Sequence, residues 1–290
     1  MRRYQCCQVL FLMAALTPAV CAGQNAAALP LVAPAQASGT TANVVNCRTI
    51  AAGDPSLDLV SKLCEFALTY RHQLPDFIVQ QTTTFQGPHS TSVMTEQVTF
   101  RKGLENYSHL TIDGKPIPPD TPLPRNIRFT SAGEFGSNLV DLFAVAGATE
   151  FKFRKTSILR DVPVAIYEFH VPEKKNTFWT LRDGNGRAWR PELRGEVWLE
   201  LQTGHPLREE LEAIHLPSNR LIDSAKTVTD YAMTPVAEVG TFLLPVKSES
   251  AVCSRPRAGF RAGCATSVLV FHDYQKFAAT TRILTSSSQP

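Results

Sequence analysis

One stretch, SAGEFGSNLVDLFAVAG at residues 131–147, predicts a helix in a chain whose other segments mostly predict β-strands. Ser131 and Glu134 have the spacing of a capping box, in which each side chain satisfies a free backbone N–H at the start of a helix. Gly147 stands where a left-handed C-cap is expected. Apolar side chains at helical spacing form one face: Phe135, Leu139, Leu142 and Phe143. A helix with one apolar face must bury it, so we expect this helix to pack against a sheet.

The segments around this helix alternate apolar and polar residues, as half-buried β-strands do. Strands are expected at residues 76–85, 93–100, 106–112, 150–157, 162–171, 178–182, 194–201, 207–214, 225–231, 242–250 and 265–274. Short turns join most of them, which favours an antiparallel meander of consecutive strands. The fold class is therefore mainly β (α+β), as a strongly curved antiparallel sheet or half-open β-barrel.

A second helix is predicted between Asp54 and Gln73. Asp54 is a good N-cap, and Pro55 suits the first helical position. The apolar stripe consists of Leu59, Leu63, Phe66 and Tyr70. Leu74-Pro75 ends the helix, because proline has no N–H to donate and restrains the residue before it. We expect both helices to lie on the concave side of the sheet.

The N-terminus has the pattern of a secretory signal peptide over residues 1–22. Met1-Arg2-Arg3 is a short basic region, residues 9–15 are apolar, and Val20-Cys21-Ala22 is a small-residue cleavage site. The apolar run is too short to span a bilayer, so the mature chain is expected to be periplasmic or extracellular without a transmembrane span. Lipid modification of Cys21 instead of its removal is the alternative, although Pro18-Ala19-Val20 departs from the usual lipobox.

The domain organisation follows from composition. Residues 23–46 carry no charge and no periodicity, which predicts a disordered leader. Residues 47–278 are expected to form a single domain, and the polar residues 279–290 a disordered tail. Loss of residues 1–22 would leave 27 basic residues against 26 acidic ones, a net charge of +1. That balance argues against nucleic acid as a partner.

Four cysteines follow the predicted signal peptide, an even number that suits disulfides in an oxidising compartment. Three pairings are possible, and short loops favour Cys47 with Cys64 and Cys253 with Cys264. Each such bond would contribute about 3 kcal/mol in the chain-entropy model. A zinc site is the rival interpretation, but no C-x-x-C pair is present and the compartment is unfavourable.

The hairpin RGEVWLELQTGHPLREE at residues 194–210 has a strand with Trp198, a Thr-Gly turn and then His-Pro-Leu-Arg. It resembles a recurrent hairpin of the periplasmic lipoprotein-sorting superfamily, which includes the lipoprotein carrier and the envelope-stress sensor domain. LPDF at 74–77, GEFG at 133–136 and LLPV at 243–246 are similar to an uncharacterised secreted bacterial branch. The resemblance covers roughly residues 55–275 and implies a half-open β-barrel whose helices plug an apolar cavity. The leader and the two predicted disulfides depart from the carrier.

The resemblance gives the helix at residues 131–147 two interpretations. Its apolar side chains, Phe135, Leu139, Leu142 and Phe143, would line a ligand cavity as a lid, or they would plug the core. The first implies an exported, non-enzymatic protein that binds a lipid or acyl chain, with a role in envelope lipid or lipoprotein handling. The alternative is an envelope interaction or sensor module with a self-filled core, whose partner is another envelope protein.

No catalytic or nucleotide-binding motif is recognisable, so neither enzymatic activity nor a cofactor is expected. The seven histidines are scattered, and although His109, His170 and His272 could meet across a sheet, we expect no metal site. The segment DGNGR at 183–187 hints at a calcium loop but lacks the distal glutamate, and a turn explains it.

Arginines surround Trp189 in a second group of candidate residues. Arg187, Arg190 and Arg194 could contact an anionic headgroup or an acidic partner, with the aromatic ring beside them. The alternative is that these arginines are solvated and serve solubility. Arg255, Arg257 and Arg261 form a similar group in the loop between Cys253 and Cys264.

Overall fold

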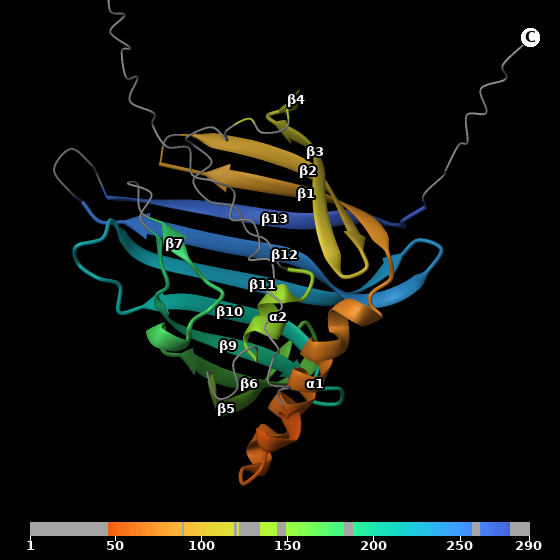
Figure 1. Cartoon of the computed structure of the whole chain (residues 1–290), viewed down its shortest axis with the longest axis vertical. Helices are drawn as coiled ribbons and strands as arrows, with labels where there is room; N and C mark the ends of the chain where they lie inside the picture. Colours follow the sequence, from red (N-terminus) through yellow and green to blue (C-terminus); the bar gives the residue numbers. More distant parts are fainter. Residues whose placement is uncertain are drawn as a thin grey trace, which may run out of the picture.

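The computed structural model describes residues 46–88, 90–118, 121, 134–143, 149–182, 188–256 and 262–278. These residues form a large antiparallel sheet whose concave face holds two helices, as Figure 1 shows from the helix side. The predicted signal peptide, nearly all of the leader and the tail lie outside the described residues. The predicted fold class, a mainly β curved sheet with two inner helices, is confirmed.

The strands of the sheet agree well with the alternating segments of the sequence. Their bounds are β1 (Phe77–Gln86), β2 (Thr91–Arg101), β3 (Leu104–Ile112), β4 (Lys115–Pro116), β5 (Glu150–Leu159), β6 (Val162–Val171), β9 (Glu192–Glu200), β10 (Pro206–Ile214), β11 (Ile222–Val236), β12 (Gly240–Ser254) and β13 (Gly263–Lys276). Strands β11 and β12 are longer than predicted, because they pair with each other from Ile222 opposite Ser254 to Val236 opposite Gly240.

The order of the strands is β4-β3-β2-β1-β13-β12-β11-β10-β9-β6-β5. Two meanders, β1–β4 and β5–β13, are thus joined side by side where β1 pairs with β13, from Phe77 opposite Lys276 to Gln86 opposite Thr266. The prediction that consecutive strands pair throughout the sheet was therefore wrong where β1 pairs with β13. The sheet is not closed into a barrel, and β4 and β5 are its two edges.

The segment predicted as a strand at 178–182 is mostly a loop, and this expectation was wrong. Residues Leu181–Arg182 form the short strand β7, which pairs with β8 (Ala188–Trp189) in a separate two-stranded sheet. The loop follows the 3₁₀ turn η3 (Glu173–Lys175). Asn176 holds it by donating to the carbonyl oxygens of Trp179, at 2.9 Å, and Pro191, at 2.7 Å. This buried amide satisfies backbone groups that a strand would otherwise pair.

Helix α1 (Asp58–Gln73) confirms the helix predicted from Asp54. The Asp54 side chain accepts from the Ser56 N–H at 2.9 Å, and so it caps the preceding 3₁₀ turn η2 (Pro55–Leu57), which leads into α1. The helix ends before Leu74, as its proline neighbour requires. Its buried face points to the sheet: Val60, Leu63, Cys64, Ala67 and Tyr70.

Helix α2 (Ser137–Asp141) is much shorter than the helix predicted over 131–147, and this prediction was wrong. Gly136 has a φ of +103°, which breaks the α-helix, so Glu134 lies in a turn before it. A Cβ at Gly136 would lie 2.4 Å from the Tyr70 ring, so the chain can pass there only without a side chain. Ser131 of the predicted capping box and Gly147 of the predicted C-cap lie outside the described residues.

Residues 134–143, here called the α2 segment, connect two parts of the core. Phe135 lies among aromatic rings of the sheet, with centroid distances of 5.0 Å to Phe271 and 5.3 Å to Phe77. Leu139 and Leu142 instead belong to the second cluster, which joins α1 to β6, β9 and β10. The segment is therefore held by the packing of its side chains rather than by a long run of helical hydrogen bonds.

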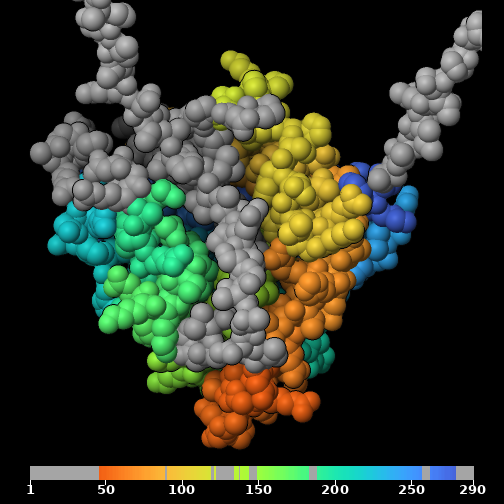
Figure 2. Space-filling model, in the orientation of Figure 1, coloured from red at the N-terminus to blue at the C-terminus, as the bar shows by residue number. Residues whose placement is uncertain are grey.

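Both predicted disulfides are confirmed. Cys253 and Cys264 face each other on β12 and β13 and are bonded. Cys47, in the 3₁₀ turn η1 (Cys47–Thr49), is bonded to Cys64 on α1. The second bond attaches the start of the described chain to the inner helix. Figure 2 shows α1 in orange and the β2–β3 hairpin in yellow on this same face of the molecule.

Candidate functional site

The predicted lid side chains fill the inside of the half-barrel. Phe135, Leu139, Leu142 and Phe143 are exposed by at most 4%. All four pack against other buried side chains of the described core. Their burial agrees with a plug. Whether they also line a ligand cavity stays a prediction.

An apolar groove of about 290 Å³ lies at the rim of the half-barrel, between the start of α1 and the middle of β5 and β6. Its apolar lining consists of Pro55, Leu59, Phe153, Ala165, Tyr167 and Leu201. Phe153 and Leu201 are 39% and 40% exposed, so two large apolar side chains of the lining are open to solvent. The polar rim of the groove comes from Ser56 and Asp58 at the start of α1.

The groove is continuous with the core. Tyr167 is 2% exposed and belongs to the same buried cluster as Leu139 and Leu142 of the α2 segment. Its hydroxyl donates to the Ser56 carbonyl oxygen at 2.7 Å, which fastens η2 to β6. The Phe153 ring meets the Tyr167 ring edge-on at 5.6 Å between centroids. An apolar chain laid in the groove would therefore contact side chains that also form the interior.

The concave face of the sheet also carries a row of buried polar side chains. Glu209 on β10 is directly opposite Thr229 on β11, and Thr229 is opposite Ser248 on β12. These three residues are 5%, 2% and 1% exposed. The Thr229 and Ser248 hydroxyls are 3.2 Å apart and hydrogen-bonded. Directly opposite residues of an antiparallel sheet point to the same face, so the row crosses the interior of the half-barrel.

Carboxyl groups of the α2 segment raise the pKa of Glu209, the acidic residue of this row. Burial, together with the charges of Asp141 and Glu134, raises the pKa of Glu209 to about 7. Burial also raises the pKa of Asp141, to about 6 against the opposing effect of the nearby Arg71. Glu96 on β2 has a pKa raised to about 7 by burial and by Glu134. The interior therefore holds carboxyl groups on both the sheet and the segment that covers it.

Tyr231 on β11 is the next polar group of this interior. Together, Glu209, Asp141, Glu134 and Tyr231 are here called the acidic patch. The residue is fully buried, and its hydroxyl oxygen has no hydrogen-bond partner. Burial raises its pKa well above 10, with further contributions from Glu209, Tyr70 and Glu134. By contrast, the buried Tyr70 hydroxyl donates to the Leu243 carbonyl oxygen at 2.6 Å. An unpaired hydroxyl in a protein interior is uncommon, and it calls for a polar partner.

Sequence reasoning missed Glu209 and Tyr231. The alternation in residues 207–214 places Glu209 on the same face as Leu211 and Ala213, which was the available signal. Tyr231 shares the inward face with Thr229 in the same way. Neither pattern shows that the two strands are neighbours of a segment with Glu134 and Asp141.

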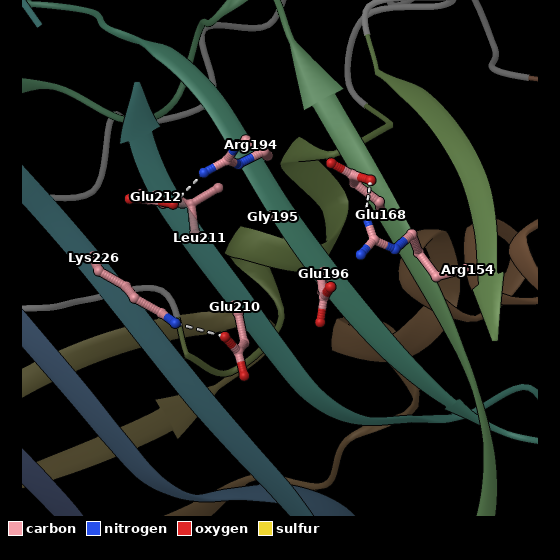
Figure 3. A pocket seen from close by; sticks show the side chains of 9 residues that line it. All are labelled: Arg154, Glu168, Arg194, Gly195, Glu196, Glu210, Leu211, Glu212 and Lys226. Atoms are coloured by element: carbon pink, nitrogen blue, oxygen red, sulfur yellow. Dashed lines mark hydrogen bonds and ion pairs between the residues drawn. The ribbon is translucent and has the colours of Figure 1, made fainter. Parts of the chain in front are cut away.

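A second groove, of about 340 Å³, lies on the outer face of β5, β6, β9, β10 and β11 and is shown in Figure 3. Ion pairs between neighbouring strands line it. Arg154 contacts Glu168 at 2.7 Å, and Arg194 contacts Glu212 at 3.0 Å. Lys226 contacts Glu210 at 2.7 Å. Exposed pairs of this kind contribute little stability, and they describe a solvated surface with matched charges.

The arginines predicted as a headgroup or partner contact do not gather into one described site. Arg194 belongs to the outer groove and is paired. Arg190 is exposed before β9, and Arg187 lies outside the described residues. Their role in binding stays a prediction. The segment 183–187, considered as a calcium loop, also lies outside the described residues.

Two of the histidines contact an acidic residue, Glu192. His170 lies 2.6 Å from Glu192, which also contacts His215 at 3.1 Å. Across the described residues, no set of histidine, cysteine and acidic side chains has the arrangement needed to hold a metal ion. Neither helix in the described part of the chain has the length and apolar character required to cross a membrane.

No protein-family model matches the sequence, and the search of curated proteins found no match. Among solved structures, the chain is similar to a LolA superfamily protein from Nitrosomonas europaea, with 14% identity and a TM-score of 0.36 over 75% of this chain and 93% of that chain. It is also similar to a DUF1329 family protein from Desulfovibrio piger, with 12% identity and a TM-score of 0.39 over 77% and 95%.

A third similar structure is a putative outer membrane lipoprotein-sorting protein domain from Vibrio parahaemolyticus, with 14% identity and a TM-score of 0.36 over 73% of this chain and 90% of that chain. The name of this structure matches the superfamily that the hairpin at residues 194–210 resembles. At these identities and TM-scores the likeness says nothing about a ligand.

Proposed function

We propose that this is an exported, non-enzymatic protein that binds an apolar chain, from a lipid or a lipoprotein acyl group, in its half-barrel. The observation that carries the proposal is the rim groove, whose lining passes without a break into the buried core. Its volume of about 290 Å³ is near the lower end of small-ligand sites, which suits one chain rather than a bulky molecule.

Export is supported by two independent features. The predicted signal peptide at residues 1–22 addresses the chain to the secretory route. The two disulfides are of the kind that persists in oxidising compartments such as the periplasm. Together they support a binding function outside the cytoplasm, where envelope lipids and lipoproteins are available as ligands.

The experiment compares Phe153→Ser with Ile158→Ser in displacement of a fluorescent apolar probe by dodecanol. Both residues lie on β5, but Phe153 lines the groove whereas Ile158 does not and is 69% exposed. Loss of the Phe153 ring from the groove lining should weaken dodecanol binding about tenfold in the first variant. Ile158→Ser should bind as the unmodified protein does. Equal binding by all three proteins would contradict the groove as the binding site.

The second candidate function is an envelope interaction or sensor module that takes no small ligand. It is favoured by the complete burial of Leu139 and the near-complete burial of Phe135, which show a well-filled interior. Native mass spectrometry of protein purified from a periplasmic preparation separates the two functions. Co-purified lipid supports the first, whereas a uniformly empty protein that also fails to bind dodecanol supports the second.

A further inference from the structure

We infer that the inner face of the sheet at Glu209 and Tyr231 receives a positively charged amino group of the bound ligand. This inference rests on the proposed function, because it concerns the polar end of a ligand whose apolar chain occupies the half-barrel. It adds a chemical class that the apolar groove alone does not specify: a lipid or chain with an amine rather than an acidic or neutral end.

The first step concerns charge. Glu209 is 5% exposed, and the charges that act on it come from Asp141 and Glu134, both acidic. No basic side chain of the described residues contributes to its pKa. Arg71, the nearby cation, acts on Asp141. A buried carboxylate surrounded in this way gains from a cation that it does not yet have.

The second step concerns the unpaired hydroxyl. Tyr231 is fully buried, its oxygen has no hydrogen-bond partner, and Glu209 acts electrostatically on it. Glu209 on β10 is paired with Thr229 on β11, and Tyr231 follows Thr229 by two residues on the same buried face of that strand. An ammonium group has three N–H donors, so one can be donated to a Glu209 oxygen and another to the Tyr231 oxygen. Charge-assisted hydrogen bonds of this kind are about twice as strong as neutral ones.

The same two residues discriminate against other ligand ends. A phosphate or a fatty-acid carboxylate would add negative charge beside Glu209, Glu134 and Asp141, which is unfavourable in a site shielded from water. A neutral alcohol could pair with Tyr231, but it would leave the acidic charge of Glu209 uncompensated. Among ligands with the same apolar chain, the amine is therefore the one that satisfies both groups.

Protonation of Glu209 should oppose amine binding. Since its pKa is raised to about 7, the carboxylate form that an ammonium group needs is lost as the pH falls below that value. The groups that face it are Asp141 and Glu134 from the α2 segment and Tyr231 from β11. Amine affinity is therefore expected to decrease between pH 8 and pH 5, whereas alcohol affinity stays constant.

The test measures binding of dodecylamine, dodecanol and dodecanoate to the full mature chain by displacement of the fluorescent apolar probe, below the micelle concentration of each ligand. We expect dodecylamine to bind at least about tenfold more tightly than dodecanol at pH 8. Glu209→Gln should lower amine affinity to that of the alcohol and leave alcohol binding unchanged. Glu210→Gln, whose side chain lies on the outer face beside Lys226, is the matched control.

The outcomes separate the two levels of the proposal. If amine and alcohol bind equally to the unmodified protein, or if Glu209→Gln keeps the amine preference, the inference is overturned while the proposed function stands. If none of the three ligands displaces the probe, both are overturned. Tyr231→Phe provides a second variant that keeps the ring in the core, and we expect it to weaken amine binding severalfold.

Discussion

Glu209→Gln should make the protein more stable at pH 8 and leave its stability almost unchanged at pH 4. The substitution keeps the shape of the side chain and removes a carboxyl group that is buried beside Asp141 and Glu134. Below its ordinary pKa of 4.5, Glu209 is protonated in both the folded and the unfolded chain, so it causes no electrostatic penalty.

The magnitude follows from the difference between the folded and unfolded pKa. Between pH 4.5 and about pH 7 the unfolded chain releases this proton while the folded chain keeps it, so the free energy of unfolding falls as the pH rises. Each pKa unit corresponds to about 1.4 kcal/mol. The shift from 4.5 to about 7 therefore removes about 3 kcal/mol above pH 7, and Glu209→Gln should restore that amount.

Urea unfolding followed by tryptophan fluorescence, at pH 4 and at pH 8, measures this difference. The difference in free energy between Glu209→Gln and the unmodified protein should grow from near zero to about 3 kcal/mol. Glu210→Gln on the outer face should show no such growth, since its side chain is paired with Lys226 at the surface. A stabilisation that is the same at both pH values would refute the reasoning, because it would show that the effect is not ionisation.

Three further substitutions test the packing. Gly195→Ala would place a Cβ 2.1 Å from the Glu210 carbonyl oxygen and 2.3 Å from the buried Phe169 ring. We expect the free energy of unfolding to fall by about 3 kcal/mol or more, and Phe169→Leu should recover only part of it because the backbone contact remains; an unchanged urea midpoint would contradict this. Leu139→Ala should cost about 2–5 kcal/mol in the same assay, and a loss much below that would mean that the α2 segment contributes little to the core. Replacing Cys253 and Cys264 by serine should cost about 3 kcal/mol, measured without reductant, and no change in thermal midpoint would count against the loop-entropy argument.

Much of the sheet was predictable because its strands have one apolar and one polar face. The predicted strand 76–85 matches β1 (Phe77–Gln86) to within one residue at each end, where fully buried and partly exposed residues alternate. Helix α1 was predictable for a similar reason, since its capping residue, its stripe and its proline stop all agree. Where local propensity, pattern and turn chemistry point to one structure, sequence reasoning is reliable.

The α2 segment was not predicted correctly because a local pattern competed with tertiary packing. Gly136, which follows the apparent capping box, has a left-handed conformation that interrupts the predicted helix, and a Cβ there would clash with the Tyr70 ring of α1. The pairing of β1 with β13 could not be read from the sequence either, since it depends on contacts between distant strands. The acidic patch depends on both, because Glu134 and Asp141 meet Glu209 only in the folded chain.

Strand β13 has a consequence for the order in which the molecule can be assembled. Because it pairs with both β1 and β12, the two meanders become one sheet only when the last strand has joined. A chain that lacks it would present the unpaired edges of β1 and β12, which are templates for association with other chains. On the proposed export route, the fold would be completed only after the whole chain has crossed the membrane. Loss of β13 would be expected to cause aggregation rather than a smaller stable domain.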